Sequence, residues 1–260
     1  MIKKIQIFGE RNSGTNYLKS LIKLNFENID ITTEFGWKHW FPFSEGDPHY
    51  KGKKDSECCL FIVIYRNPFD WLRSFHQNPW HSHFSLKGIK FSKFIRKEWF
   101  CMWNDEANIG NNNPKYNSEM LFERDPETNK RFKNVLKLRS SKIKYFQKLK
   151  EQVKNICYIR YEDLKDNPDI LKDIALKFHI KLKNNSIINE DTYKGFKEEK
   201  YIPKKYPPFS KKDLKFIHEN LNWDLENLIG YNFNDYTPKH ISLSNRIIKL
   251  FNNLLNYKRK

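Results

Sequence analysis

Apolar and polar positions alternate along this chain in blocks that match strands and helices. An apolar run over residues 5–8 stops at Gly9, a polar turn follows over residues 10–16, and apolar positions then recur at helical spacing from Tyr17 to Ile22. This pattern predicts a strand, a tight loop and a helix. Such a loop directs several backbone amides and the positive end of a helix dipole at one point, which favours a bound phosphate or sulfate group.

The rest of the chain continues the alternation. Residues 58–65 form a continuous apolar run, which is typical of a strand buried on both faces of a parallel sheet. Asn67 and Pro68 after it suit the N-cap and the first position of a helix. Another short buried strand is predicted over residues 156–159, and further helices over residues 91–103, 131–153, 170–179 and 211–221.

Strands that alternate with helices predict an α/β fold with a central, mainly parallel sheet flanked by helices, which we assign to residues 1–239. In such folds ligands bind at the carboxyl ends of the strands. Residues 9–14, Arg66 and Tyr161 each follow the end of a predicted strand, and His39 follows a short extended piece predicted over residues 29–34. We therefore expect these residues to meet in one site.

Three segments fall outside this core pattern. Residues 104–130 are polar and long, which indicates a functional lid or an insertion. The loop around Lys200 is basic and contains several prolines. Residues 240–260 predict a basic amphipathic helix, which would dock onto its own domain or contact a membrane surface or a partner.

Composition and charge change this picture little. The 260 residues have a formal net charge of +17, which raises nucleic acid, anionic lipid or an acidic substrate as partners. The lysines are dispersed along the chain, so most are expected on the solvated surface. No stretch reaches the ~18 apolar residues of a membrane span, and the chain opens directly with a strand, so we expect a cytoplasmic protein. The four cysteines form no CxxC pair and are expected to be reduced.

The spacing Gly9-x-x-x-x-Gly14 matches the phosphate loop of nucleoside triphosphatases, but that motif continues with Lys and then Ser or Thr. Here Thr15 and Asn16 stand at those two positions. The amide cradle is kept, while the lysine and the metal-binding hydroxyl are missing. The spacing alone is also compatible with a simple strand-to-helix turn.

Four segments resemble motifs of sulfotransferases that use 3′-phosphoadenosine 5′-phosphosulfate. Residues 11–17 (RNSGTNY) look like the 5′-phosphosulfate loop of that family, and the segment from Arg66 to Ser74 is similar to its 3′-phosphate motif. Residues 161–168 (YEDLKDNP) look like the segment beside the adenine, and residues 37–42 (WKHWFP) resemble the segment that carries the general base. The four motifs occur in the family's order, which makes the resemblance more specific than any single motif.

The resemblance implies a three-layer, P-loop-like fold and an enzyme that moves a sulfuryl group to a hydroxyl or amine acceptor by in-line transfer, without a metal. It implies His39 as the general base, assisted by Lys38 and Arg11. The acceptor would be a small molecule or a saccharide, and a basic rim suits an acidic saccharide. The residues implied to bind the nucleotide are Arg11, Asn12, Ser13, Gly14, Thr15, Asn16, Arg66, Ser74, Tyr161 and Lys200.

Two departures from the family pattern affect the site. The loop lysine of the family falls on Asn12, and Arg11 beside it is a candidate substitute. Lys38 is adjacent to His39 rather than two residues away, so in an extended segment the two side chains would point to opposite faces. A purely structural role for His39 among Trp37 and its other aromatic neighbours remains an alternative.

Two other functions remain open from the residues alone. A phosphate-loop nucleotide kinase or triphosphatase is one, although Thr15 and Asn16 disfavour it. A non-enzymatic basic module that binds nucleic acid is the other. The buried strands and the ordered anion loop are not explained by that second alternative, so we expect no nucleic-acid partner.

Overall fold

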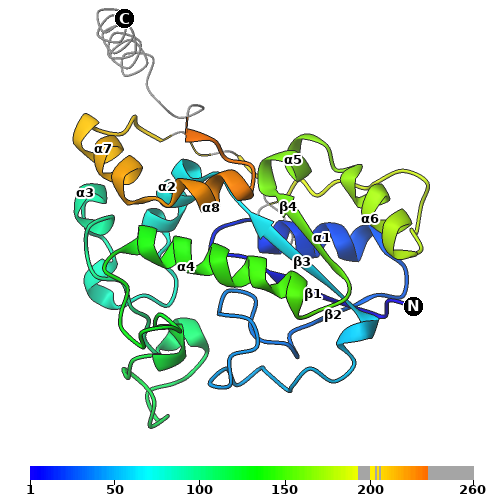
Figure 1. Ribbon diagram of the computed structural model, residues 1–260, viewed down its shortest axis with the longest axis horizontal. Helices are drawn as coiled ribbons and strands as arrows, with labels where there is room; N and C mark the ends of the chain where they lie inside the picture. Colours follow the sequence, from blue (N-terminus) through cyan, green and yellow to red (C-terminus); the bar gives the residue numbers. More distant parts are fainter. Residues whose placement is uncertain (193–199, 203, 205, 234–260) are drawn as a thin grey trace, which may run out of the picture. The chain divides into compact units, whose positions relative to one another are not determined.

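The computed structural model of this chain describes residues 1–192, 200–202, 204 and 206–233 (Figure 1). The chain divides into two compact units, Met1–Leu221 and Asn222–Lys260. The helix predicted over residues 240–260 lies outside the described residues. In the part of the chain that the structure describes, every helix is too short or too polar to cross a bilayer.

A parallel sheet of four strands forms the centre of the first unit. The strands are β1 (Lys4–Phe8), β2 (Asp30–Thr32), β3 (Cys59–Tyr65) and β4 (Ile156–Arg160), and their order in the sheet is β2-β1-β3-β4. Each neighbouring pair is parallel, with Ile5 opposite Leu60 in the central pair. All residues of β3 are buried, as its apolar run predicts. The predicted α/β fold with a parallel central sheet is confirmed.

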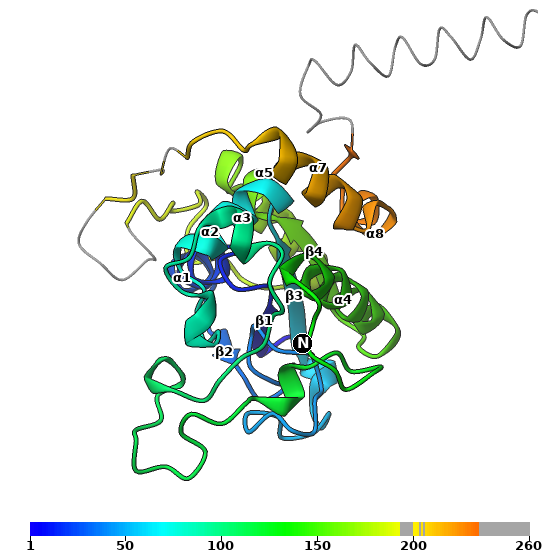
Figure 2. The same ribbon diagram turned by 90° about the vertical axis from the view of Figure 1, so that its left-hand side faces the viewer.

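Helices cover both faces of this sheet, which gives the predicted three layers. Alternate strand residues such as Ile62 and Ile64 share one core cluster with α1, α5 and α6. On the opposite face Phe8 stacks on Phe146 of α4, with ring centroids 6.1 Å apart. Figure 2 shows α1 and α4 on opposite sides of the strands. The helices of the first unit are α1 (Thr15–Asn25), α2 (Pro68–Gln77), α3 (Phe91–Phe94), α4 (Val135–Lys148), α5 (Tyr161–Asp166), α6 (Ile170–Phe178) and α7 (Lys211–Asn220), and the second unit contains α8 (Trp223–Leu228).

Local capping explains where two of these helices begin. The Asn67 side chain accepts hydrogen bonds from the amides of Phe69 and Asp70, and Pro68 stands at the first position of α2, as predicted. Asn134 caps α4 in the same way by accepting from two amides of its first turn. Both caps satisfy backbone donors that a helix end leaves unpaired.

The helix predicted over residues 91–103 is wrong beyond its first turn, because α3 ends at Phe94. The chain after it is extended locally, and isolated antiparallel bridges join Trp99 to Phe132 and Met102 to Glu119. Trp99 is fully buried by this pairing. Burial of the indole against the neighbouring segment therefore overrides the helical spacing of the aromatic residues.

The segment of residues 104–130 differs from the predicted lid at its C-terminal end. Residues 108–118 are mostly exposed, but Met120 and Glu123 are almost completely buried. The ring of Phe122 also packs against Trp40, with centroids 4.4 Å apart. Met120 and Glu123 are thus part of the core rather than of a cover over a site, while Leu121 between them is exposed.

We expect Gly9→Ala to lower the free energy of unfolding by about 1–3 kcal/mol, the usual cost of overpacking. A Cβ atom on Gly9 would lie 2.6 Å from Ser13 Oγ and 2.7 Å from the backbone oxygen of Ile64, which cannot move aside easily. Urea unfolding measures the loss. Gly110→Ala is the matched control, because nothing lies within 4 Å of its added Cβ, and an equal loss in both variants would contradict the packing explanation.

Candidate active site

A cavity of about 550 Å³ lies where the segments that follow the four strands come together. The cavity is lined by residues that follow β1 and begin α1, and by residues that follow β2, β3 and β4. The segments that follow the strands therefore meet at one cavity, as the sequence predicts. The predicted site residues that line the cavity are Arg11, Asn12, Gly14, Thr15, Asn16, Lys38, His39, Arg66, Ser74, Tyr161 and Lys200.

The loop between β1 and α1 provides an N-terminus without a side-chain cap. Gly14 is the N-cap residue of α1, no side chain bonds to the first-turn amides, and the first turn has no acidic residue. Gly14 adopts φ of +100°, and an added Cβ would lie 2.4 Å from the ring of Tyr161. Only glycine fits this close approach, and the uncapped amides together with the helix dipole favour an anion.

Ser13 is the one predicted site residue that does not line the cavity. Its side chain is completely buried beneath the loop, and its Oγ has no hydrogen-bond partner within the described part of the chain. The Ser13 amide donates to the Glu10 carbonyl at 3.1 Å and so closes the turn. The geometry gives Ser13 a place in the turn and no side-chain contact with a ligand in the cavity.

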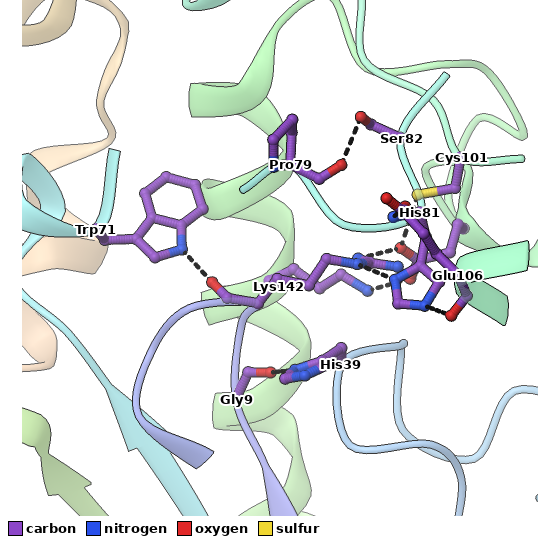
Figure 3. A network of polar contacts seen from close by, with 11 residues as sticks. Gly9, His39, Trp71, Pro79, His81, Ser82, Cys101, Glu106 and Lys142 are labelled. Atoms are coloured by element: carbon purple, nitrogen blue, oxygen red, sulfur yellow. Dashed lines mark hydrogen bonds and ion pairs between the residues drawn. The ribbon is translucent and has the colours of Figure 1, made fainter. Parts of the chain in front are cut away.

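Arg11 points its guanidinium into a buried ion cluster. Its Nη1 donates to Glu123 at 2.7 Å, and Lys142 of α4 donates to the other oxygen of the same carboxylate at 2.7 Å. Figure 3 shows Lys142, His81 and Cys101 around this cluster. Burial raises the pKa of Glu123, but Arg11 and Lys142 outweigh that effect and hold the pKa below its ordinary value. The Arg11 charge is thus already paired, which disfavours Arg11 as the substitute for the family's loop lysine.

Asn12, at the position of that lysine, ties the loop to α2. Its side-chain amide donates to the Ser74 carbonyl at 2.8 Å, and its backbone oxygen accepts from Arg66 Nη1 at 2.9 Å. The Arg66 guanidinium also lies over the ring of Tyr161, with 4.9 Å between Cζ and the ring centroid. Arg66, Ser74 and Tyr161 are therefore held together by the loop.

Lys38 and His39 both reach the cavity because their segment is a turn rather than an extended strand. The Trp40 amide donates to the Trp37 carbonyl at 2.9 Å, which closes the turn. The opposite-face geometry expected for an extended segment does not arise. Lys38 Nζ donates to the side chain of Asn16, and this bond places an ammonium group at the start of α1. Lys38 thus brings a cation to the loop that lacks its lysine.

The ring of His39 has a fixed tautomer. His39 Nδ1 lies 2.8 Å from the Gly9 carbonyl oxygen, which can only accept, so Nδ1 carries the hydrogen and Nε2 keeps its lone pair. Burial lowers the pKa of His39 well below its ordinary value, the charges of Lys38 and Arg11 lower it further, and the bond to Gly9 opposes them only in part. His39 is therefore neutral near pH 7 and can accept a proton at Nε2.

Sequence reasoning missed several residues that line the cavity. Asn78 lies one turn beyond Ser74 at the end of α2, and helical spacing from the 3′-phosphate motif was a signal for it. Trp80 and His81 follow in a loop whose path the sequence does not indicate. The same holds for residues 189–192, which reach the site through a bond from Tyr17 to Asn189 and a bond from Ser20 to Glu190. The remaining lining residues that were not predicted are Tyr17, Trp37, Lys165 and Tyr201.

Comparisons with known proteins add no family assignment: no protein-family model matches the chain, and no curated protein matches it significantly. Within the described residues, no group of three or more His, Cys, Asp or Glu side chains is arranged to hold a metal ion. A function must therefore be inferred from the side chains of the cavity.

We expect His81 to make stability depend on pH. Burial, with the nearby Arg11 charge, lowers the pKa of His81 from 6.5 to about 3. Because the unfolded chain binds this proton more tightly, the stability is fully present above about pH 6.5 and is lost as the pH falls toward the folded pKa, at up to about 1.4 kcal/mol per pH unit. Urea unfolding near pH 7 and near pH 5 should show a loss of about 2 kcal/mol in the wild type that His81→Gln does not show.

His39, whose pKa burial also lowers, and carboxylates such as Glu119 also lose stability as the pH falls, but they are present in both proteins. The difference between the two pH dependences therefore isolates His81. Identical pH dependences in the wild type and His81→Gln would show that the ring is not held neutral by its surroundings.

Proposed function

We propose that this protein is a sulfotransferase that uses 3′-phosphoadenosine 5′-phosphosulfate. The observation that carries the proposal is the pairing of an uncapped helix N-terminus with a neutral histidine in one cavity. His39 has its lone pair on Nε2, and the amides after Gly14 lie in the same cavity. Sulfuryl transfer needs this combination of a base for the acceptor and a fixed positive environment for the leaving phosphate.

The residues of the cavity fit the nucleotide in three respects. The first-turn amides after Gly14 have no side-chain cap and suit a phosphosulfate. Arg66 Nε is buried and has no hydrogen-bond partner in the described part of the chain, so the guanidinium retains a donor for a 3′-phosphate beside Ser74. Tyr161 and Tyr17 meet edge to face at 5.9 Å and offer an aromatic surface for the adenine.

In this proposal the nucleotide and the residues of the cavity have separate roles in the transfer. The nucleotide supplies the sulfuryl group. His39 Nε2 takes the proton of the acceptor hydroxyl or amine as the new bond to sulfur forms and the bond from sulfur to the bridging phosphate oxygen breaks. Lys38 and the amides of residues 14–16 stabilise the negative charge that develops on that leaving oxygen. A sulfuryl group has less charge than a phosphoryl group, so residue charges alone are expected to suffice.

We expect adenosine 3′,5′-bisphosphate to raise the melting temperature without added metal, and ATP with Mg²⁺ to raise it much less. At a hundred times its dissociation constant a ligand adds about 2.7 kcal/mol, which is a shift of several degrees for a chain of this size. Equal stabilisation by Mg-ATP would favour the phosphate-loop kinase or triphosphatase instead. Stabilisation by single-stranded nucleic acid alone would favour the binding module.

Arg66→Ala should weaken bisphosphate binding by about 1.5–3 kcal/mol, because it removes a charge-assisted contact to the 3′-phosphate. Binding of adenosine 5′-phosphosulfate, which lacks that phosphate, should change little. Calorimetry on both ligands measures the difference. Arg124→Ala is the control, since Arg124 pairs with Glu119 and does not line the cavity. Equal losses for both ligands would assign Arg66 to the support of the loop alone.

His39→Ala should leave bisphosphate affinity nearly intact and lower the transfer rate by about 10²–10⁴-fold, the usual contribution of a positioned base. In the wild type the rate should stay flat as the pH falls through 6.5, because the lowered pKa of His39 keeps the ring neutral there. The rate should fall only at more acidic pH. Transfer from labelled nucleotide, measured across this pH range, tests both statements.

The control for His39→Ala is its melting temperature, because the ring also contacts Trp37 with centroids 4.7 Å apart. A folded, nucleotide-binding His39→Ala protein with full transfer activity would remove His39 from the mechanism. A wild-type rate that halves near pH 6.5 would show that the ring is solvated rather than buried.

A further inference from the structure

Residues 44–51, which we call the Asp47 loop, are folded around one buried carboxylate. The Asp47 side chain is completely buried, although positions 45, 46, 48 and 49 around it are exposed. The Asp47 amide donates to the Ser44 carbonyl at 3.0 Å, and the Asp47 carbonyl accepts from the Tyr50 amide at 3.0 Å. Burial of a carboxylate is costly unless its oxygens are hydrogen-bonded, so the partners of this side chain indicate why it is there.

Three N–H groups donate to the Asp47 carboxylate. Its Oδ2 accepts from the backbone amide of Trp37 at 2.5 Å, and its Oδ1 accepts from the backbone amide of His49 at 2.8 Å. The His49 ring nitrogen Nδ1 lies 3.1 Å from the same Oδ1, and because a carboxylate only accepts, Nδ1 carries the hydrogen. Two of these donors belong to the Asp47 loop itself, whereas the Trp37 amide belongs to the turn beside the cavity. Asp47 therefore joins the two segments.

The peptide group between Gly36 and Trp37 is held at both of its polar atoms. Its carbonyl oxygen accepts from the completely buried Gln6 side chain of β1 at 3.1 Å, and its N–H donates to Asp47. Gly36 adopts φ of +120°, and an added Cβ atom would lie 3.0 Å from Asp47 Oδ2. The close approach of the carboxylate thus requires glycine at this position. The orientation of this peptide is set by β1 on one side and by the Asp47 loop on the other.

The indole of Trp37 connects this peptide to His39. The two rings meet edge to face, with centroids 4.7 Å apart and an interplanar angle of 89°. His39 lines the cavity and is only half-buried, so the indole provides part of the cover of the imidazole. The Gly9 carbonyl accepts from Nδ1 of the same ring (Figure 3). A displaced Trp37 would leave that bond in place but would let water reach the ring.

We propose that Asp47 is a positioning residue for His39: by accepting from the Trp37 amide it keeps the indole against the imidazole and fixes that ring in the cavity. Asp47 is not among the described residues that line the cavity, so it acts through Trp37 rather than by contact with a ligand. The role of His39 as a base rests on the proposed sulfotransferase function. The contacts that hold its ring do not depend on which reaction the cavity performs.

The protonation of His39 is a sensitive measure of this positioning. Burial lowers its pKa well below the ordinary value, and the charged or titratable groups that face it are Lys38 from the same turn, Arg11 from the loop after β1 and His81 from the loop after α2. A variant at Asp47 retains all three of these side chains. A rise in the pKa of His39 in such a variant would therefore report greater access of water to the ring.

We expect Asp47→Ala to raise the pKa of His39 by about one pH unit, toward the ordinary value of about 6.5. NMR titration of the histidine ring signals measures this change, and His39→Ala identifies the signal. Asp213→Ala is the matched control, because the Asp213 carboxylate is also buried and pairs with Arg96 at 2.5 Å, away from the residues that line the cavity. An unchanged pKa in folded Asp47→Ala, or an equal rise in Asp213→Ala, would overturn the proposal.

Two further measurements test the route through Trp37. Trp37→Ala removes the indole directly, so the double variant Trp37→Ala/Asp47→Ala should raise the pKa of His39 no further than Trp37→Ala alone. Additive rises would show that Asp47 acts on His39 by another route. Hydrogen exchange in the wild type needs no variant: the Trp37 amide should be protected by its bond to Asp47, and rapid exchange of that amide would contradict the proposal.

The transfer rate separates this inference from the proposed function. With saturating nucleotide, Asp47→Ala should lower the rate of sulfate transfer by about tenfold or more and move its acid limb to higher pH. If Asp47→Ala raises the pKa of His39 but the wild type transfers no sulfate, the positioning contact stands and the sulfotransferase proposal fails. If the wild type transfers sulfate and Asp47→Ala changes neither the rate nor the pKa, the sulfotransferase proposal stands and the role of Asp47 is wrong.

Discussion

One buried carboxylate, Glu123, is shared by two buried cations, Arg11 and Lys142. Charges in a protein interior are tolerated only when they are closely paired, so this cluster fixes the position of each of its members. Glu10, the residue before Arg11, is paired in the same way with Arg139, at 2.6 Å. Both charged residues of the loop are thus drawn beneath it, toward α4 on the far face of the sheet. Apart from the paired Arg11, the loop residues that line the cavity are uncharged, and the uncapped amides at the start of α1 suit an anion.

The backbone of the loop and most of the positive charge beside it therefore depend on different residues. The charges within the loop sequence are paired beneath it, and the cations other than Arg11 that line the cavity come from other segments. Lys38 comes from the turn after β2 and Arg66 from the end of β3. A lysine at the position of Asn12 would lose the bond from that side chain to Ser74, which couples the loop to α2. At Asn12, where the sulfotransferase motif that this loop resembles has a lysine, the cavity thus contains a cation from another segment, Lys38, and the loop gains a contact to α2.

The sequence was sufficient for those parts of the fold that depend on local pattern. The apolar run of β3, the cap at Asn67 and the meeting of the strand ends follow from periodicity, capping chemistry and parallel topology. The end of α3 at Phe94 could not be predicted, because it depends on the pairing of Trp99 with Phe132 far along the chain. The ion pair of Arg11 with Glu123 joins residues more than a hundred positions apart, and no periodicity indicates such a contact. The site was therefore predictable in its location but not in the direction of individual side chains.

Gly9 connects the loop that follows β1 with the segment that contains Lys38 and His39. Its amide donates to the Lys38 carbonyl at 2.9 Å, and its carbonyl accepts from His39 Nδ1 at 2.8 Å. The residue that follows β1 and begins the loop thus also orients the His39 ring and the turn that holds it. Two hydrogen bonds to one residue leave little freedom between the loop and the imidazole, so their separation is set by the sheet edge itself. Because Glu123 holds Arg11 of the same loop from the core, the spacing between the loop amides and the His39 ring is determined by the fold itself.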